Sequence, residues 1–200
     1  MIKELNILIA GVGGQGVILM SELLGNAAVR DGLRIRGSEV LGMAVRGGSV
    51  FSSLRLGSDV YGPLPPLGKC DIMVSMEPSE ALRNIAFLPK SSLIIVNTAI
   101  VIPFTVSLGV SKYPDLEVII EKLEGASSKV VQLDGNQLAR EAGDLRTANI
   151  AMLGALFGTG KIPIKEESIK KEIEERFPPK IVPVNHKAFD LGIEACQQVQ

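Results

Sequence analysis

The sequence is poor in the residues that most often carry catalysis or bind metals. Its 200 residues include two cysteines, one histidine and no tryptophan. Cys70 and Cys196 are too few for a disulfide framework and too far apart in the sequence for a local metal site. An iron–sulfur cluster usually takes four cysteine ligands, so this chain alone cannot hold one. The only histidine, His186, has no obvious carboxylate or nucleophile near it in the sequence, and we do not expect it to act as a general base.

The sequence also lacks an excess of charge and long hydrophobic runs. Its 21 Lys and Arg are balanced by 22 Asp and Glu, and aromatic residues make up only 4%. Without a basic field or a set of stacking rings, nucleic-acid binding is not expected. The longest apolar stretch, residues 93–104, is interrupted by polar residues and Pro103, so no membrane helix is expected. The N-terminus has no basic region followed by a long apolar stretch, which favours a cytoplasmic protein.

The remaining composition is that of a globular protein, and its pattern alternates strands with helices. A hydrophobic share of 46% over 200 residues predicts one compact domain spanning residues 1–200. Apolar runs predict strands at residues 5–10, 33–36, 49–56, 71–76, 93–97 and 130–133. Helical spacing predicts helices at residues 17–29, 79–87, about 116–123, 148–157 and about 164–177. The alternation predicts an α/β fold with three α/β/α layers around a Rossmann-like, mixed, mostly parallel sheet.

Two details of this prediction concern residues 37–61. Residues 49–56, the turn Gly57-Ser58-Asp59 and Val60-Tyr61 are typical of an antiparallel hairpin, which makes the sheet mixed. Residues 37–48 have four glycines and no steady period, so we expect a functional loop or a broken helix there.

A glycine-rich turn follows the first predicted strand. Gly11-Val12-Gly13-Gly14-Gln15-Gly16 fits the G-x-G-x-x-G pattern between a strand and a helix, which is the context of a dinucleotide site. Glycines allow positive φ angles, and the helix start offers N–H groups to an anion. Glu39 stands near the place where such a site carries an acid for the ribose. Three interpretations stay open: a nucleotide site, a purely structural turn, or a turn that presents its backbone to a partner protein or shared ligand.

Two further segments carry groups that could meet a ligand. Arg46 directly precedes Gly47 and Gly48, where a planar guanidinium beside open backbone suits a carboxylate or phosphate. Glu77-Pro78-Ser79 follows a predicted strand and could place a carboxylate at the carboxyl edge of the sheet. An equally open interpretation makes Ser79 a helix cap and lets Glu80 complement the helix dipole.

Taken together, five segments resemble the gamma-type subunits of the 2-oxoacid:ferredoxin oxidoreductase family, and within it the indolepyruvate group. They include G-V-G-G-Q-G-V, R-G-G-S-V and E-P-S-E-A-L-R, and they lie at residues 11–17, 38–50, 77–83, 146–155 and 185–192. The resemblance covers nearly the whole chain. Leu41 departs from the pattern, because relatives in the indolepyruvate group often carry His there, so a polar role at that place is lost.

The resemblance implies a subunit that is inactive alone and has no catalytic or metal-binding residue of its own. The enzyme would oxidatively decarboxylate an arylpyruvate with coenzyme A, giving an acyl-CoA, CO2 and reduced ferredoxin; pyruvate, 2-oxoisovalerate and 2-oxoglutarate are alternative substrates. Thiamine diphosphate, Mg and 4Fe-4S clusters would belong to a partner alpha subunit, over whose active site the gamma-type domain packs. The rival interpretation is a free-standing nucleotide-binding module, and a homodimer of the isolated chain stays open. The residues expected to border the active site or face the partner are Gly11, Gly13, Gly14, Gln15, Gly16, Glu39, Arg46, Gly47, Gly48 and Ser49.

Overall fold

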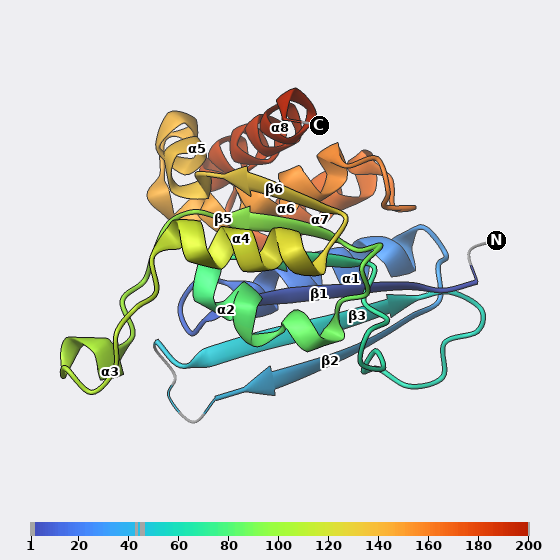
Figure 1. The fold of residues 1–200 in the computed structure, drawn as a ribbon. Coiled ribbons are helices and arrows are strands. Elements are labelled where there is room, and N and C mark those ends of the chain that lie inside the picture. The colour runs from blue at the N-terminus through green and yellow to red at the C-terminus, as the bar shows by residue number, and fades with distance from the viewer. Residues whose placement is uncertain (1–2, 43, 45–46, 200) are drawn as a thin grey trace.

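The centre of the molecule is a twisted sheet whose strands run mostly in one direction (Figure 1). The computed structural model describes residues 3–42, 44 and 47–199, so Arg46 lies outside the described residues. The sheet has six strands in the order β2-β3-β1-β4-β5-β6. Their bounds are β1 Leu5–Val12, β2 Ile35–Leu41, β3 Ser49–Leu56, β4 Ile72–Ser75, β5 Leu93–Asn97 and β6 Lys129–Leu133. β1, β4, β5 and β6 pair in parallel, whereas β3 is antiparallel to both β1 and β2. The predicted mixed, mostly parallel sheet is confirmed.

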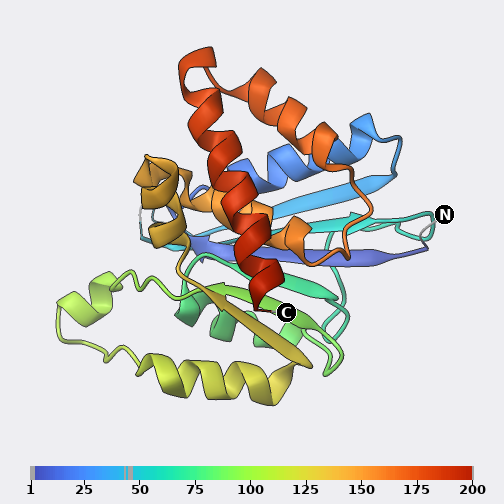
Figure 2. The same ribbon diagram turned by 90° about the horizontal axis from the view of Figure 1, so that it is seen from above.

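Helices cover both faces of this sheet, which confirms the three α/β/α layers (Figure 2). Their bounds are α1 Val17–Arg30, α2 Pro78–Arg83, α3 Phe104–Ser107, α4 Leu116–Ala126, α5 Gly135–Ala142, α6 Ala148–Gly158, α7 Glu166–Arg176 and α8 Val182–Gln198. Short 3-10 turns lie at Ile85–Phe87, Leu145–Thr147 and Pro179–Ile181. None of the helices in the described residues is both long and apolar enough to cross a lipid bilayer.

The two faces of the sheet bury separate hydrophobic clusters. In β1, Ile7 and Ile9 pack under α1 and α5 to α8, while Leu8 between them packs toward α2 and α4. This alternation follows from the two-residue period of a strand, and both faces are apolar because both are covered. The buried helix predicted at residues 148–157 is confirmed, since every residue of α6 is buried.

Two sequence predictions about residues 37–61 were wrong. Residues 37–41 continue β2 instead of forming a loop or a broken helix, and they pair with β3 from Gly37 opposite Leu54 to Leu41 opposite Val50. The pattern hid this strand because β2 lies at the sheet edge and most of its residues are exposed. Val60 and Tyr61 do not pair with β3, because β1 and β2 already occupy its two edges.

Three helices, α3, α5 and α8, were not predicted. α3 has only 4 residues, too few to show a helical period. α5 buries only the small residues Gly135, Ala139 and Ala142, and α8 buries a stripe that mixes Asn185 and Gly192 with apolar residues. Neither helix therefore shows the continuous apolar stripe on which a sequence prediction depends.

Candidate functional site

The glycine-rich turn lies between β1 and α1, at the carboxyl edge of the sheet where Figure 1 also places the end of β2, the start of β3 and the projecting α3 segment. Gly14 and Gly16 have φ angles of 101° and 81°, which side-chain-bearing residues rarely adopt. A Cβ atom at Gly16 would lie 2.4 Å from the Asn149 side-chain nitrogen, whereas one at Gly14 would meet no atom within 4 Å. Gly16 is therefore required by packing, and Gly14 faces open space.

The side chain of Gln15 holds the glycine-rich turn in this conformation through two hydrogen bonds. Its side-chain oxygen accepts a hydrogen bond from the backbone N–H of Val12 at 2.8 Å, and its side-chain nitrogen donates to the carbonyl of Met76 at 3.0 Å. A Cβ atom at Gly11 would lie 2.8 Å from the same Gln15 oxygen. Gln15 and Gly11 thus shape the turn and tie it to the end of β4.

The start of β3 holds the turn from the other side. The N–H of Gly13 donates to the carbonyl of Gly48 at 2.8 Å, and the N–H of Gly47 donates to the carbonyl of Gly13 at 3.0 Å. The hydroxyl of Ser49 then donates to Glu80 Oε2 at 2.5 Å. The structure therefore brings together the predicted residues Gly13, Gly47, Gly48 and Ser49.

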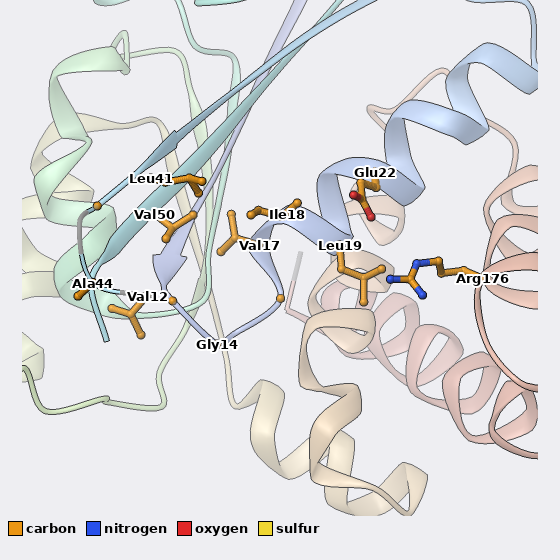
Figure 3. A pocket seen from close by; sticks show the side chains of 13 residues that line it. Val12, Gly14, Val17, Ile18, Leu19, Glu22, Leu41, Ala44, Val50 and Arg176 are labelled. Atoms are coloured by element: carbon orange, nitrogen blue, oxygen red, sulfur yellow. The ribbon is translucent and has the colours of Figure 1, made fainter. Parts of the chain in front are cut away.

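A cavity of about 510 Å³ opens between the glycine-rich turn, the first turns of α1 and the hairpin (Figure 3). Val12, Val17 and Val50 give it an apolar floor, while Leu41 and Ala44 line the hairpin side. Glu22 and Arg176, both exposed, lie on the opposite side beside α1 and α7 (Figure 3).

The cavity also borders backbone groups that can donate hydrogen bonds. Helix α1 has a glycine N-cap without a side-chain bond, and no described residue accepts from the N–H groups of Gly14, Val17 or Ile18. Free N–H groups at a helix start, together with the positive end of the helix dipole, favour an anionic group. The cavity can therefore accommodate an apolar body that carries an anionic end.

Two buried carboxylates stand beside the turn at the end of β4. Glu77 is the N-cap of α2: its Oε2 accepts from the Ser79 N–H at 2.7 Å, and its Oε1 accepts from the Tyr113 hydroxyl at 2.5 Å. Glu80, 3% exposed, accepts from Ser49 and pairs with Arg83 at 3.0 Å. Burial raises the pKa of Glu80, and burial together with the bond to Glu77 raises the pKa of Tyr113. The carboxylate predicted at this edge is present, and the cap is Glu77 instead of Ser79.

Glu39 does not join these groups. It lies exposed on the edge strand β2, and β3 stands between β2 and β1. The dinucleotide fold places its acidic residue on the strand next to β1, at the same sheet edge as the glycine turn. With β3 interposed and Glu39 outside the cavity lining, the geometry does not support the ribose contact of the nucleotide-binding rival.

Sequence reasoning missed Asn149 of α6, which lies against Gly16 in the turn, and Arg176 of α7, which lines the opposite side of the cavity. Asn149 stood in the 146–155 segment of the resemblance, whereas nothing in the pattern distinguishes Arg176 from other charged residues of its helix. Within the described ranges, no three His, Cys, Asp or Glu side chains gather into a possible metal site.

Comparisons with known proteins agree on one family. The family model described as pyruvate ferredoxin/flavodoxin oxidoreductase matches residues 6–195. The chain is 44% identical over 198 residues to the protein named indolepyruvate oxidoreductase subunit IorB of Pyrococcus horikoshii, with 98% of each chain covered. It is 27% identical, with 94% of each covered, to the pyruvate/ketoisovalerate oxidoreductases common subunit gamma of Pyrococcus abyssi.

A solved structure shares the fold along the same length. The gamma subunit of a keto/oxoacid ferredoxin oxidoreductase from Geobacter sulfurreducens superposes with a TM-score of 0.71 at 26% identity, covering 97% of this chain and 99% of that one. The predicted resemblance and fold class are thereby confirmed.

Proposed function

Because the chain belongs to the pyruvate ferredoxin/flavodoxin oxidoreductase family, we propose that it is the subunit without thiamine of a heteromeric indolepyruvate:ferredoxin oxidoreductase. One observation carries the substrate class. Identity is 44% to a subunit named for indolepyruvate but 27% to one named for pyruvate and ketoisovalerate, at similar coverage.

The reaction joins an arylpyruvate to coenzyme A. The bond between the carboxylate and the oxo carbon breaks, CO2 leaves, and the coenzyme A sulfur bonds to the former oxo carbon; two electrons pass to ferredoxin and one proton is released. Thiamine diphosphate with Mg would stabilise the carbanion left by decarboxylation, and 4Fe-4S clusters would carry the electrons. The clusters would belong to the partner, because this chain has only two cysteines, both buried, with Cys70 before β4 and Cys196 in α8. Thiamine diphosphate would belong there too, because the sequence has no Gly-Asp-Gly thiamine motif.

The contribution of this chain is the border of the active site. The glycine-rich turn and the start of β3 would face the partner, with the N–H groups of Gly14 and Val17 toward an anionic group of substrate or coenzyme A. The apolar cavity walls would exclude water there. Arg46, next to this edge in sequence, would meet a carboxylate or phosphate. We further propose that residues 1–200 act as one domain in a cytoplasmic complex, with no role for nucleic acid or membrane.

Purification from the source organism tests this proposal. We expect the chain to come with a partner that contains iron and thiamine, and the complex to reduce ferredoxin with an arylpyruvate and coenzyme A. Activity on pyruvate, 2-oxoisovalerate or 2-oxoglutarate instead would change the substrate. Recovery alone, with saturable calorimetric binding of NAD, NADP or FAD, would establish the rival nucleotide-binding module.

A variant of the same complex tests the border. Arg46→Lys keeps the charge but removes the planar fork, so we expect turnover to fall by about tenfold. Arg36→Lys, an exposed position on β2, is the matched control and should leave turnover unchanged. Equal turnover in both variants would remove Arg46 from the site.

A further inference from the structure

Glu80 is a buried carboxylate to which the proposed function gives no role. It is the third residue after Glu77, the N-cap of α2, and is 3% exposed. Burying a charge is costly unless hydrogen bonds and an opposite charge compensate. Its side chain has partners on two different elements: the Ser49 hydroxyl at the start of β3, and Arg83 on its own helix.

We propose that Glu80 is a positioning residue that acts through Ser49 to fix the glycine-rich turn at the active-site border. This inference rests on the proposed function, which makes the glycine-rich turn part of the active-site border. The side-chain partners of Glu80 are Ser49 and Arg83, and Glu80 does not line the cavity, so it is not a catalytic residue.

The path of contacts from Glu80 to the turn is short. Ser49 Oγ donates to Glu80 Oε2 at 2.5 Å, a length typical of a charge-assisted bond. Ser49 directly follows Gly47 and Gly48, whose backbone exchanges two hydrogen bonds with Gly13 at 2.8 and 3.0 Å. The side-chain hydrogen bond between Ser49 and Glu80 therefore connects α2 to the segment that is hydrogen-bonded to the turn.

A second path leads from the same segment of the chain to the other side of the turn. The carbonyl of Met76, just before Glu77, accepts from the side chain of Gln15 at 3.0 Å and from Asn97 at 3.3 Å. The turn is thus held on one side by the end of β4 and on the other by β3, and Glu80 links these two supports. Without that link, the start of β3 would keep its strand pairing but lose its connection to α2.

The groups around Glu80 show which of its contacts connects α2 to another element. Glu77, three residues earlier, instead accepts hydrogen bonds from Ser79 and from the hydroxyl of Tyr113. Arg83 is 62% exposed and lies on the same helix as Glu80, so this ion pair does not connect α2 to another element. The bond to Ser49 is therefore the contact of Glu80 that reaches beyond α2.

The test uses Ser49→Ala, Glu80→Ala and the double variant, each in the assembled complex. We expect each single change to raise KM for the 2-oxoacid or coenzyme A by about tenfold, and the double change to add less than about twofold, because both remove one bond. Ser49→Thr and Glu80→Gln keep donor and acceptor and should stay within about twofold of wild type. Arg83→Gln is the control and should not alter KM. A role in stability alone would lower the recovery of complex and leave KM unchanged, which would overturn the inference.

A second measurement on the isolated full chain separates this inference from the proposed function. Amide hydrogen exchange at Gly13 should become about tenfold faster in Ser49→Ala and Glu80→Ala, but not in Arg83→Gln. Unchanged exchange overturns the inference, and so does an altered exchange with an unaltered KM. A wild-type complex that oxidises no 2-oxoacid overturns the proposed function, and exchange at Gly13 then decides whether Glu80 holds the turn.

Discussion

The two ends of the sheet both bury polar side chains, but they use them differently. At the amino end, Arg55 is 8% exposed and donates to Asn6 at 2.8 Å, to Glu4 at 2.6 Å and to the carbonyls of Gly62 and Leu64 at 2.9 and 3.2 Å. At the carboxyl end, the hydrogen bonds of Gln15, Ser49 and the glycines hold a turn whose outer N–H groups have no described acceptor.

The difference is that the polar groups at the amino end form a structural hydrogen-bond network, whereas those at the carboxyl end leave backbone N–H groups without a described acceptor. Around Arg55, donors and acceptors satisfy one another, which leaves little for a ligand to contact. Around the glycine-rich turn, bonds fix a shape and the cavity of about 510 Å³ stays lined by donors and apolar side chains. Buried polar groups at one end stabilise the fold, whereas at the other they support the proposed active-site border, in keeping with the rule that ligands bind at the carboxyl edge of open α/β sheets.

Arg55→Ala should produce the largest change and affect stability alone. It leaves buried acceptors on Asn6 and two carbonyls without a donor, and we expect a loss of about 2–4 kcal/mol in the free energy of unfolding. For a chain of this length that lowers Tm by roughly 10 °C. Thermal unfolding of the isolated chain measures the loss, and KM of the complex assembled at low temperature should not change.

The matched control for this variant is Arg34→Ala. Arg34 is exposed and makes one contact, with the carbonyl of Ser58 at 3.3 Å, so its loss should cost less than about 0.5 kcal/mol. If Arg55→Ala raised KM as much as it lowered Tm, the amino end would not be purely structural.

The sequence predicts those features of the two ends that depend on neighbouring residues, and it misses those that depend on contacts between distant residues. The run 5–10, the glycines after it and the helix after them specify β1, the turn and α1 through neighbouring residues alone. The predicted partner of β3 was wrong, because most residues of the edge strand β2 are exposed and the apolar pattern of a strand is missing there. The glycine residues of the proposed border were predicted from the sequence. The hydrogen bond between Ser49 and Glu80, 31 residues apart, and the position of Arg176 in the cavity lining were not, because they depend on tertiary packing.

Gly14→Ala should have a smaller effect, concentrated on activity. Both Gly14 and Gly143 have positive φ angles, 101° and 120°, and an added Cβ would find ordinary or open space at each. Each change should therefore cost about 1–2 kcal/mol of stability through backbone strain. Only Gly14 faces the proposed border, so we expect Gly14→Ala to lower kcat/KM of the complex by about tenfold or more. Gly143→Ala, at the end of α5, should leave it unchanged; equal losses in both would mean that strain and not position matters.

The smallest expected effect is a difference in pH dependence between the two ends. Hydrogen bonds from Asn6 and Arg55 lower the pKa of Glu4 from its ordinary 4.5, whereas burial raises the pKa of Glu80 above that value. The lowered pKa means that Glu4 stabilises the fold above pH 4.5 and that this contribution is lost as the pH falls through the folded-state pKa. The raised pKa means that the contribution of Glu80 is complete below pH 4.5 and is lost as the pH rises through its folded-state pKa.

Urea unfolding of the wild type, Glu4→Gln and Glu80→Gln between about pH 3 and about pH 7 measures both contributions. The stability advantage of the wild type over Glu4→Gln should grow with pH, while its advantage over Glu80→Gln should shrink. Slopes of the same sign would erase the distinction between the two ends. Slopes of opposite sign would show that a rising pH brings in the contribution of Glu4 to stability and removes that of Glu80, so the burial of Glu80 beside Ser49 is better explained by what it positions than by the stability it provides.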